Sequence, residues 1–91
     1  MKAQPIDQRK LVLDDGSIIQ ISIWALPEPV PPCTHRYKYR LYFGRDGRCF
    51  VRYDNERGKG DHKHIGDIET VYTFSTLETL LRDFYEDIQR N

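Results

Sequence analysis

The sequence predicts a small α+β domain in which an antiparallel sheet packs against one amphipathic C-terminal helix. Three observations support this fold class. Residues 36–43 and 48–54 alternate in polarity on either side of a glycine turn, residues 18–24 alternate in the same way, and residues 77–88 repeat apolar positions at helical spacing. Alternation places one side of each strand in a core, and a single helix would cover that side.

The N-terminal part is expected to form one hairpin. Residues 1–8 are polar and are expected to fray. The short apolar run 11–13 and the alternating run after it flank Asp15 and Gly16, a pair that is typical of tight hairpin turns. Residues 27–32 contain four prolines, which cannot donate to a sheet ladder, so this proline-rich segment is expected to be a stiff connector.

The strongest hairpin signal lies in the centre of the chain. One face collects the aromatic and aliphatic positions Tyr37, Tyr39, Leu41 and Phe43. The opposite face carries cations at Arg36, Lys38 and Arg40. The chain turns at residues 44–47 and returns as a second strand over residues 48–54, so the sequence predicts a hairpin with a basic solvated face.

The C-terminal part is expected to form a strand and then the helix. The strand is placed at residues 69–74. Ser75 is expected to cap the helix, with Glu78 reaching back to its amide in a capping box. The apolar stripe of the helix consists of Leu77, Leu80, Leu81, Phe84, Tyr85 and Ile88. Asp87 lies outside that stripe. The length of 91 residues predicts a single domain over residues 1–91, and the sequence contains no internal repeat.

Charge and composition narrow the class of protein. The chain has 14 basic and 14 acidic residues, but residues 36–63 hold nine basic and four acidic ones, a local net charge of +5. Such a face suits a polyanion such as RNA. No apolar run suits a signal peptide or a membrane span, so the chain is expected to be cytoplasmic. A chain of this length has a thin core, which a homodimer or a permanent partner would stabilise.

The unusual segment is residues 54–67, expected to be one charged loop. In extended chain, His62 and His64 point to the same side. Two neighbouring imidazoles disfavour each other's protonation, so one neutral and one charged ring can serve as base and acid for cutting RNA without a metal. The residues expected to hold phosphate are Arg52, Arg57, Lys59 and Lys63. Tyr53 is expected to donate a proton or to stack on a base.

Two other interpretations of these residues remain open. His62, His64 and Asp67 supply three ligands of the kind that a catalytic zinc uses, with Asp54 or Asp61 in support. The absence of a cysteine pair and the lysine between the histidines argue against this metal, and no cofactor is expected. The second interpretation is a non-catalytic module that uses the same basic, aromatic surface to bind nucleic acid or a protein.

The segment from Tyr53 to Asp67 resembles the signature of the TumE-like toxins of bacterial toxin–antitoxin systems. The resemblance covers residues 36–90 and rests on a tyrosine-rich strand, Tyr-Asp-Asn at 53–55, His-Lys-His at 62–64 and a C-terminal helix. It implies a small cytoplasmic toxin whose partner is an antitoxin with a helix-turn-helix domain. Asp54 and Asp67 are the acidic positions of this signature, and a supporting role is expected for them.

Overall fold

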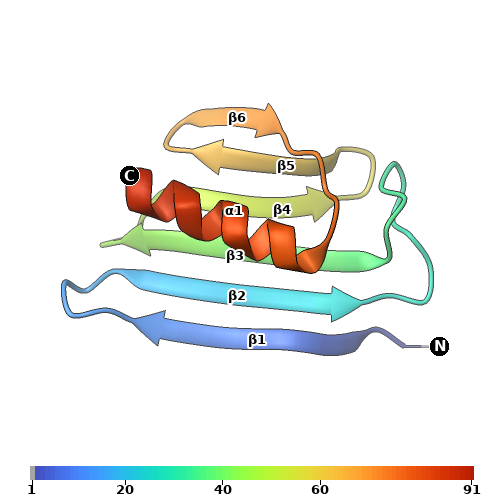
Figure 1. The fold of residues 1–91 in the computed structure, drawn as a ribbon, viewed down its shortest axis with the longest axis horizontal. Helices are drawn as coiled ribbons and strands as arrows, with labels where there is room; N and C mark the ends of the chain where they lie inside the picture. Colours follow the sequence, from blue (N-terminus) through green and yellow to red (C-terminus); the bar gives the residue numbers. More distant parts are fainter. Residues whose placement is uncertain (1) are drawn as a thin grey trace.

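The computed structural model describes residues 2–91 and shows one six-stranded antiparallel sheet with a single helix on one face (Figure 1). The strands follow the chain as a meander: β1 (Gln4–Val12), β2 (Ile18–Ala25), β3 (Tyr37–Arg45), β4 (Arg48–Glu56), β5 (Gly60–Ile65) and β6 (Ile68–Val71). Each strand pairs with the next, so all sheet contacts are made between sequence neighbours. The predicted α+β class is confirmed.

Helix α1 (Leu77–Arg90) lies along the sheet over β4 and its neighbour β3 (Figure 1). Thr76, and not the predicted Ser75, is its N-cap. Thr76 has the extended backbone of a cap residue, and its hydroxyl accepts a hydrogen bond from the Thr79 amide at 3.1 Å. The capping box with Glu78 is therefore wrong by one residue, because the hydroxyl that reaches the third helical amide is the second of two adjacent hydroxyls.

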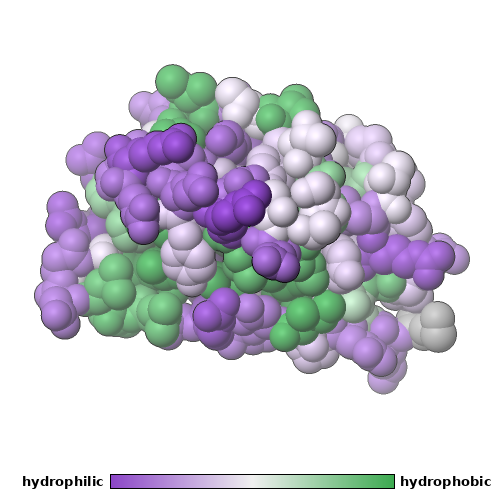
Figure 2. Space-filling model, in the orientation of Figure 1, coloured by the Kyte–Doolittle hydropathy of each residue, from purple (hydrophilic) through white to green (hydrophobic). Residues whose placement is uncertain are grey.

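The core lies between this helix and one face of the sheet. Its fully enclosed members come from β2, β3, β4 and α1, and include Ile21, Leu41, Val51, Leu80 and Phe84. These strand positions are the ones that the period-two pattern assigned to the inner face. Figure 2, which views this side, shows polar residues on the outer surface of the helix and apolar residues beside it. We call the opposite side of the sheet, which no helix covers, the open face.

Three predicted assignments are wrong. Residues 4–8, expected to fray, belong to β1, which pairs with β2 along its length. This strand is exposed, so ladder hydrogen bonds hold it rather than burial, and a hydrophobic pattern cannot reveal it. Residues 60–65, expected as loop, form β5, and the following strand is Ile68–Val71 rather than 69–74. Residues 27–32 lie outside the strands, between β2 and β3.

No helix in the described part of the chain is long and apolar enough to cross a bilayer.

Candidate functional site

The segment expected as one loop is a β-hairpin made by β4 and β5. Arg52 pairs with His64 and Asp54 pairs with His62, so these four side chains lie on the open face. The turn between the strands contains Gly58, whose φ of +81° suits a residue without a side chain. The sheet, and not a flexible loop, therefore fixes the geometry of the two histidines.

His62 is the most enclosed member of the cluster, with 3% of its surface exposed. Its Nδ1 donates to the Gly60 carbonyl oxygen at 3.1 Å, and its Nε2 lies 2.5 Å from Asp54 Oδ1. The second contact lacks hydrogen-bond alignment, so neither of its two atoms has a hydrogen-bond partner. Both ring nitrogens of His62 therefore face oxygen atoms, which fix the orientation of the ring.

His64 presents a nitrogen that accepts a hydrogen bond. Its Nε2 accepts a hydrogen bond from Arg52 Nη2 at 2.8 Å, which requires an unprotonated nitrogen. Burial lowers the pKa of His64 below 6.5, and the neighbouring Arg52 lowers it further, against the opposing effect of Glu69. Glu69 Oε2 lies 3.4 Å from the same nitrogen, and the two imidazole rings are 5.4 Å apart in an edge-to-face arrangement.

The cluster combines two imidazoles, of which His64 presents an unprotonated nitrogen, with a guanidinium and a carboxylate. The exposed fractions of the side chains separate their roles: 19% for His64 and 28% for Arg52, against 3% for His62. A substrate can therefore touch His64 and Arg52, whereas His62 can act on it only through its neighbours. Arg52 Nε also lies 3.3 Å from Asp54 Oδ2, so the carboxylate contacts and orients both Arg52 and His62.

The other cations expected to bind phosphate are not gathered here. Lys59 lies in the β4–β5 turn and pairs with Glu69 at 2.6 Å, which brings it to the edge of the cluster and lowers the pKa of Glu69. Arg57 lies in the same exposed turn. Lys63 points to the helix side, where its Nζ lies 3.2 Å from Asp87 Oδ2. Of the four predicted residues, Arg52 alone contacts a histidine within residues 2–91.

Tyr53 is placed in the core and not at the histidine cluster. Its ring is fully buried against Tyr72 and Phe84, and its hydroxyl donates to the Asp87 carboxylate. Burial raises its pKa, and so does the bond to Asp87. A side chain in this position cannot stack on a base, because residues alternate along a strand and Tyr53 lies on the opposite face from Arg52 and Asp54.

Asp87 is a residue that sequence reasoning missed. It lies outside the predicted apolar stripe but is buried between the Tyr53 hydroxyl and the Lys63 ammonium. Its position was available from spacing, since 87 follows the buried residues Leu80 and Phe84 at intervals of seven and three. Because Asp87 is charged, the hydrophobic pattern did not assign it to the buried side of the helix.

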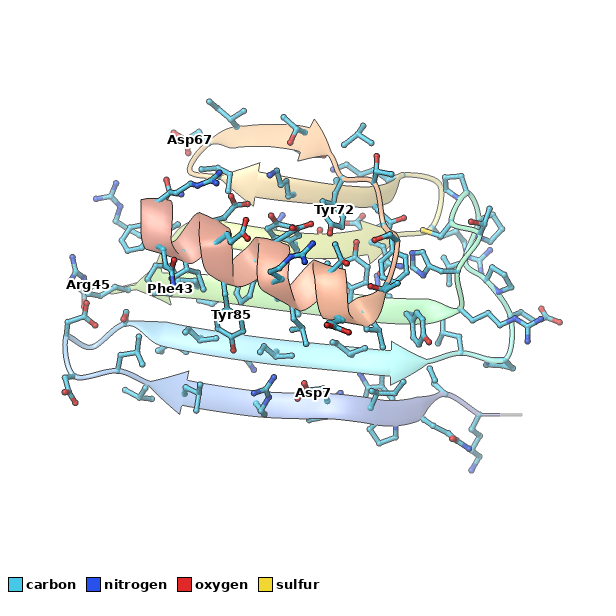
Figure 3. All side chains as sticks on the ribbon, in the orientation of Figure 1. Asp7, Phe43, Arg45, Asp67, Tyr72 and Tyr85 are labelled. Atoms are coloured by element: carbon cyan, nitrogen blue, oxygen red, sulfur yellow. The ribbon has the colours of Figure 1, made fainter. Side chains whose placement is uncertain are left out.

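A carboxylate other than the expected one accompanies the histidines. Asp67 is exposed in the β5–β6 turn, as Figure 3 shows, whereas Asp54 joins His62 and His64 in a group whose ligand atoms lie within 4.8 Å of one another. This group has the donor types of a metal site, but Arg52 lies among them and its positive charge opposes a cation. The interpretation with Asp67 as a ligand is therefore corrected by the geometry.

A second polar cluster lies where residues 33–35, which follow the proline-rich connector, meet β3 and β5. His35 Nε2 is 2.8 Å from Asp61 Oδ1, which also accepts from the Tyr39 hydroxyl at 2.7 Å, and Cys33 Sγ is within 4.8 Å of both. The Tyr37 amide donates to His35 Nδ1, so the proton is on Nε2 and faces the carboxylate. These groups satisfy one another without a metal, which indicates a structural network.

The open face is hollowed beside the histidine cluster. One depression of about 430 Å³ is lined by Gln20, Ser22, Arg40 and Tyr42. A smaller one of about 240 Å³ shares Ser22 and Arg40 and continues past Trp24, Lys38 and Asp54. These lining residues from β2 and β3 were not among the predicted site residues, although their alternation with the core positions already placed them on one face.

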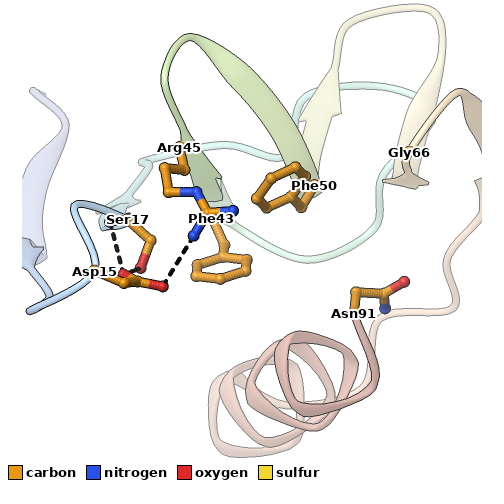
Figure 4. Close-up of a pocket in the computed structure, with 7 residues that line it drawn as sticks. All are labelled: Asp15, Ser17, Phe43, Arg45, Phe50, Gly66 and Asn91. Carbon is orange, nitrogen blue, oxygen red and sulfur yellow. Dashed lines mark hydrogen bonds and ion pairs between the residues drawn. The ribbon is translucent and has the colours of Figure 1, made fainter.

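A further depression lies at the far end of the sheet (Figure 4). Its walls include the rings of Phe43 and Phe50, and its acid, Asp15, accepts from Ser17 and lies 3.4 Å from Arg45. Because the local hydrogen bonds and ion pair already engage Asp15, this depression offers less chemistry than the open face.

Comparison with known proteins identifies one family. The family model described as "Toxin TumE" matches residues 2–91. The match therefore includes the N-terminal hairpin and the connector, which lie outside the 36–90 segment of the resemblance noted in the sequence. No significant match is found among curated proteins, and none among solved structures.

Proposed function

We propose that this chain, which belongs to the TumE family of toxins, inhibits growth by cutting RNA with His64 and Arg52 and without a metal ion. Membership in the family makes it a toxin component of a toxin–antitoxin system and implies an antitoxin partner. The observation that carries the finer proposal is the accessible pair on the open face, a neutral imidazole whose Nε2 is 2.8 Å from a guanidinium.

The chemistry proposed is attack of a 2′-hydroxyl on the neighbouring phosphorus. A phosphate that binds the Arg52 guanidinium draws it from His64 and leaves Nε2 free to accept the hydroxyl proton. The 2′ O–P bond forms and the P–O5′ bond breaks, while Arg52 stabilises the charge on the phosphoryl oxygens. His64 then returns the proton to the departing 5′ oxygen, which leaves a cyclic 2′,3′-phosphate and a 5′-hydroxyl.

His62 has a narrower role here than the sequence indicated. Its burial keeps it from the substrate, so it is a positioning residue that acts through Asp54 and Arg52. The neighbouring His62 also lowers the pKa of His64, which promotes transfer of the proton to the leaving oxygen. The antitoxin, for which we propose a helix-turn-helix protein that acts in the same cytoplasm, would neutralise the toxin by covering this open face.

The test is RNA integrity and growth in bacteria after induced expression of the wild type, His64→Ala and the control Arg82→Ala. Arg82 is exposed on the helix side, so its replacement truncates a nitrogen-bearing side chain far from the site. We expect growth arrest with fragmented RNA in the wild type and the control, and intact RNA with His64→Ala. Intact RNA in all three would refute the nuclease.

The open face also supports a second candidate, a non-catalytic binding module. Its hollows and the exposed Trp24 are features of a binding surface whether or not chemistry follows. The same experiment separates the two candidates. If His64→Ala still arrests growth while RNA stays intact in the wild type, binding rather than cleavage inhibits the cell.

A further inference from the structure

Cross-strand register aligns polar side chains into a row across the open face. The row runs through all six strands: Lys10, Gln20, Tyr42, Arg52, His64 and Glu69. Neighbouring strands lie about 4.8 Å apart, so Tyr42 is the immediate neighbour of Arg52 and is two strands from His64. A chain bound at His64 that follows the row therefore passes over β3 and β2.

A second row contains an uncommitted cation. Ser22 pairs with Arg40, and Arg40 pairs with Asp54. Both carboxylate oxygens of Asp54 already face other groups, His62 and Arg52. Arg40 is exposed, and among residues 2–91 its guanidinium makes no ion pair or side-chain hydrogen bond. It is thus available to an anion from outside the chain.

Two aromatic side chains lie beside Arg40 on the open face. The hydroxyl of Tyr42 lies over Gly44, where an added Cβ would collide with it, so the ring lies along its own strand rather than standing away from the sheet. Trp24 is 36% exposed, and its Nε1 donates to Ser22 Oγ at 3.2 Å. Both rings are therefore held at the surface of the open face beside Arg40.

The hollows connect these groups. The depression of about 430 Å³ contains Tyr42 and Arg40, and the one of about 240 Å³ contains Trp24, Lys38 and Arg40. They share lining residues, so they form one groove that leads toward Asp54 and the histidine cluster. The volume of the larger depression alone is within the range of small-molecule binding pockets in proteins, about 300–1,000 Å³.

We propose that this groove binds single-stranded RNA, with bases stacked on Trp24 and Tyr42 and phosphates held by Lys38 and Arg40. The inference rests on the proposed function and names the path of its substrate. A single strand is favoured because its bases can leave the stack and lie flat on a sheet, whereas a duplex presents only backbone to a shallow face. Zero net charge on the chain fits a local groove rather than general attraction to polyanions.

The test measures binding apart from cleavage. A fluorescent oligonucleotide of about eight 2′-O-methyl ribonucleotides lacks the attacking hydroxyl, so fluorescence anisotropy with the full chain reports affinity alone. The variants are Trp24→Ala and Arg40→Ala, with Arg82→Ala as the control on the helix side. Circular dichroism of each variant establishes that the fold is retained.

We expect Trp24→Ala to weaken binding by about five- to hundredfold, the range that loss of one stacked base produces. Arg40→Ala should weaken binding and reduce the slope of log affinity against log salt by about one, while Arg82→Ala changes neither. The groove is wrong if both open-face variants bind as the wild type does, or if duplex RNA binds as tightly as the single strand.

The outcomes also separate this inference from the proposed function. Loss of binding in the variants with intact RNA in cells keeps the groove and rejects the nuclease. Fragmented RNA in cells with unchanged binding by both variants keeps the nuclease and rejects the groove. If the variants bind RNA normally but escape neutralisation by the antitoxin, the groove is a protein-binding surface, which overturns the proposal.

Discussion

Replacing Asp87 by alanine tests the buried contact between helix and sheet that the sequence concealed. The change leaves the Tyr53 hydroxyl, which is fully buried, without its acceptor. An unsatisfied buried polar group costs about 1–3 kcal/mol. Lys63 also loses its partner, but its side chain is 30% exposed, so this adds at most about 1 kcal/mol. We expect the free energy of unfolding to fall by about 1–4 kcal/mol.

Urea and thermal unfolding, followed by circular dichroism, measure this loss. A domain of this length should lose about 5 °C or more in Tm. Glu86→Ala is the matched control, because Glu86 is the exposed acid one position earlier on the same helix, and it should change stability by less than about 0.5 kcal/mol. The decisive variant is Tyr53→Phe in the Asp87→Ala background, which removes the orphaned hydroxyl and should recover about 1 kcal/mol. Equal stability of Asp87→Ala and Glu86→Ala, or a further loss with Tyr53→Phe, would refute the contact.

Three further predictions concern the histidine cluster and the turn between β3 and β4. The rate of RNA cleavage should stay undiminished as the pH falls below 6.5, because the lowered pKa of His64 keeps the base neutral there. A pH–rate profile whose acidic limb lies above 6.5 would contradict this. Cleavage should survive EDTA, and inactivation that zinc or magnesium reverses would instead support the metal interpretation of the histidines. Gly44→Ala should destabilise the fold by more than about 2 kcal/mol, because the added Cβ would collide with the Arg48 carbonyl oxygen. Gly47→Ala has open space but a φ of +77°, so it should cost about 1 kcal/mol. Equal unfolding midpoints of the two variants would show that the backbone yields at residue 44.

Hydrophobic alternation and helical periodicity were sufficient to predict the class of fold. The inner positions of β2 and β3, such as Ile21 and Leu41, were readable because burial of one face imposes a period of two. The stripe of α1 was readable for the corresponding reason. Of β1, the sequence predicted only the end, residues 11–12, as part of a hairpin, and β5 was missed entirely. Main-chain pairing holds most of β1 and contacts among polar side chains hold β5, and neither leaves a hydrophobic pattern.

The chemistry of the candidate site was predicted in kind but not in arrangement. The two histidines could be placed on one side of an extended segment from their spacing alone. Which acid and which cation would join them depended on the register of β4 against β5, which put Asp54 and Arg52 opposite the rings and left Asp67 in a turn.

What the sequence determined by itself is therefore the pattern that each segment carries along its own length. It determined which residues of a strand share a face and which residues of the helix form its apolar stripe. The tertiary structure alone decided which faces meet, and so buried Asp87 against Tyr53 and brought Arg40 beside Asp54. The physical reason is that a side chain's environment comes from neighbours on other strands and on the helix, whose register is set by packing of the whole sheet.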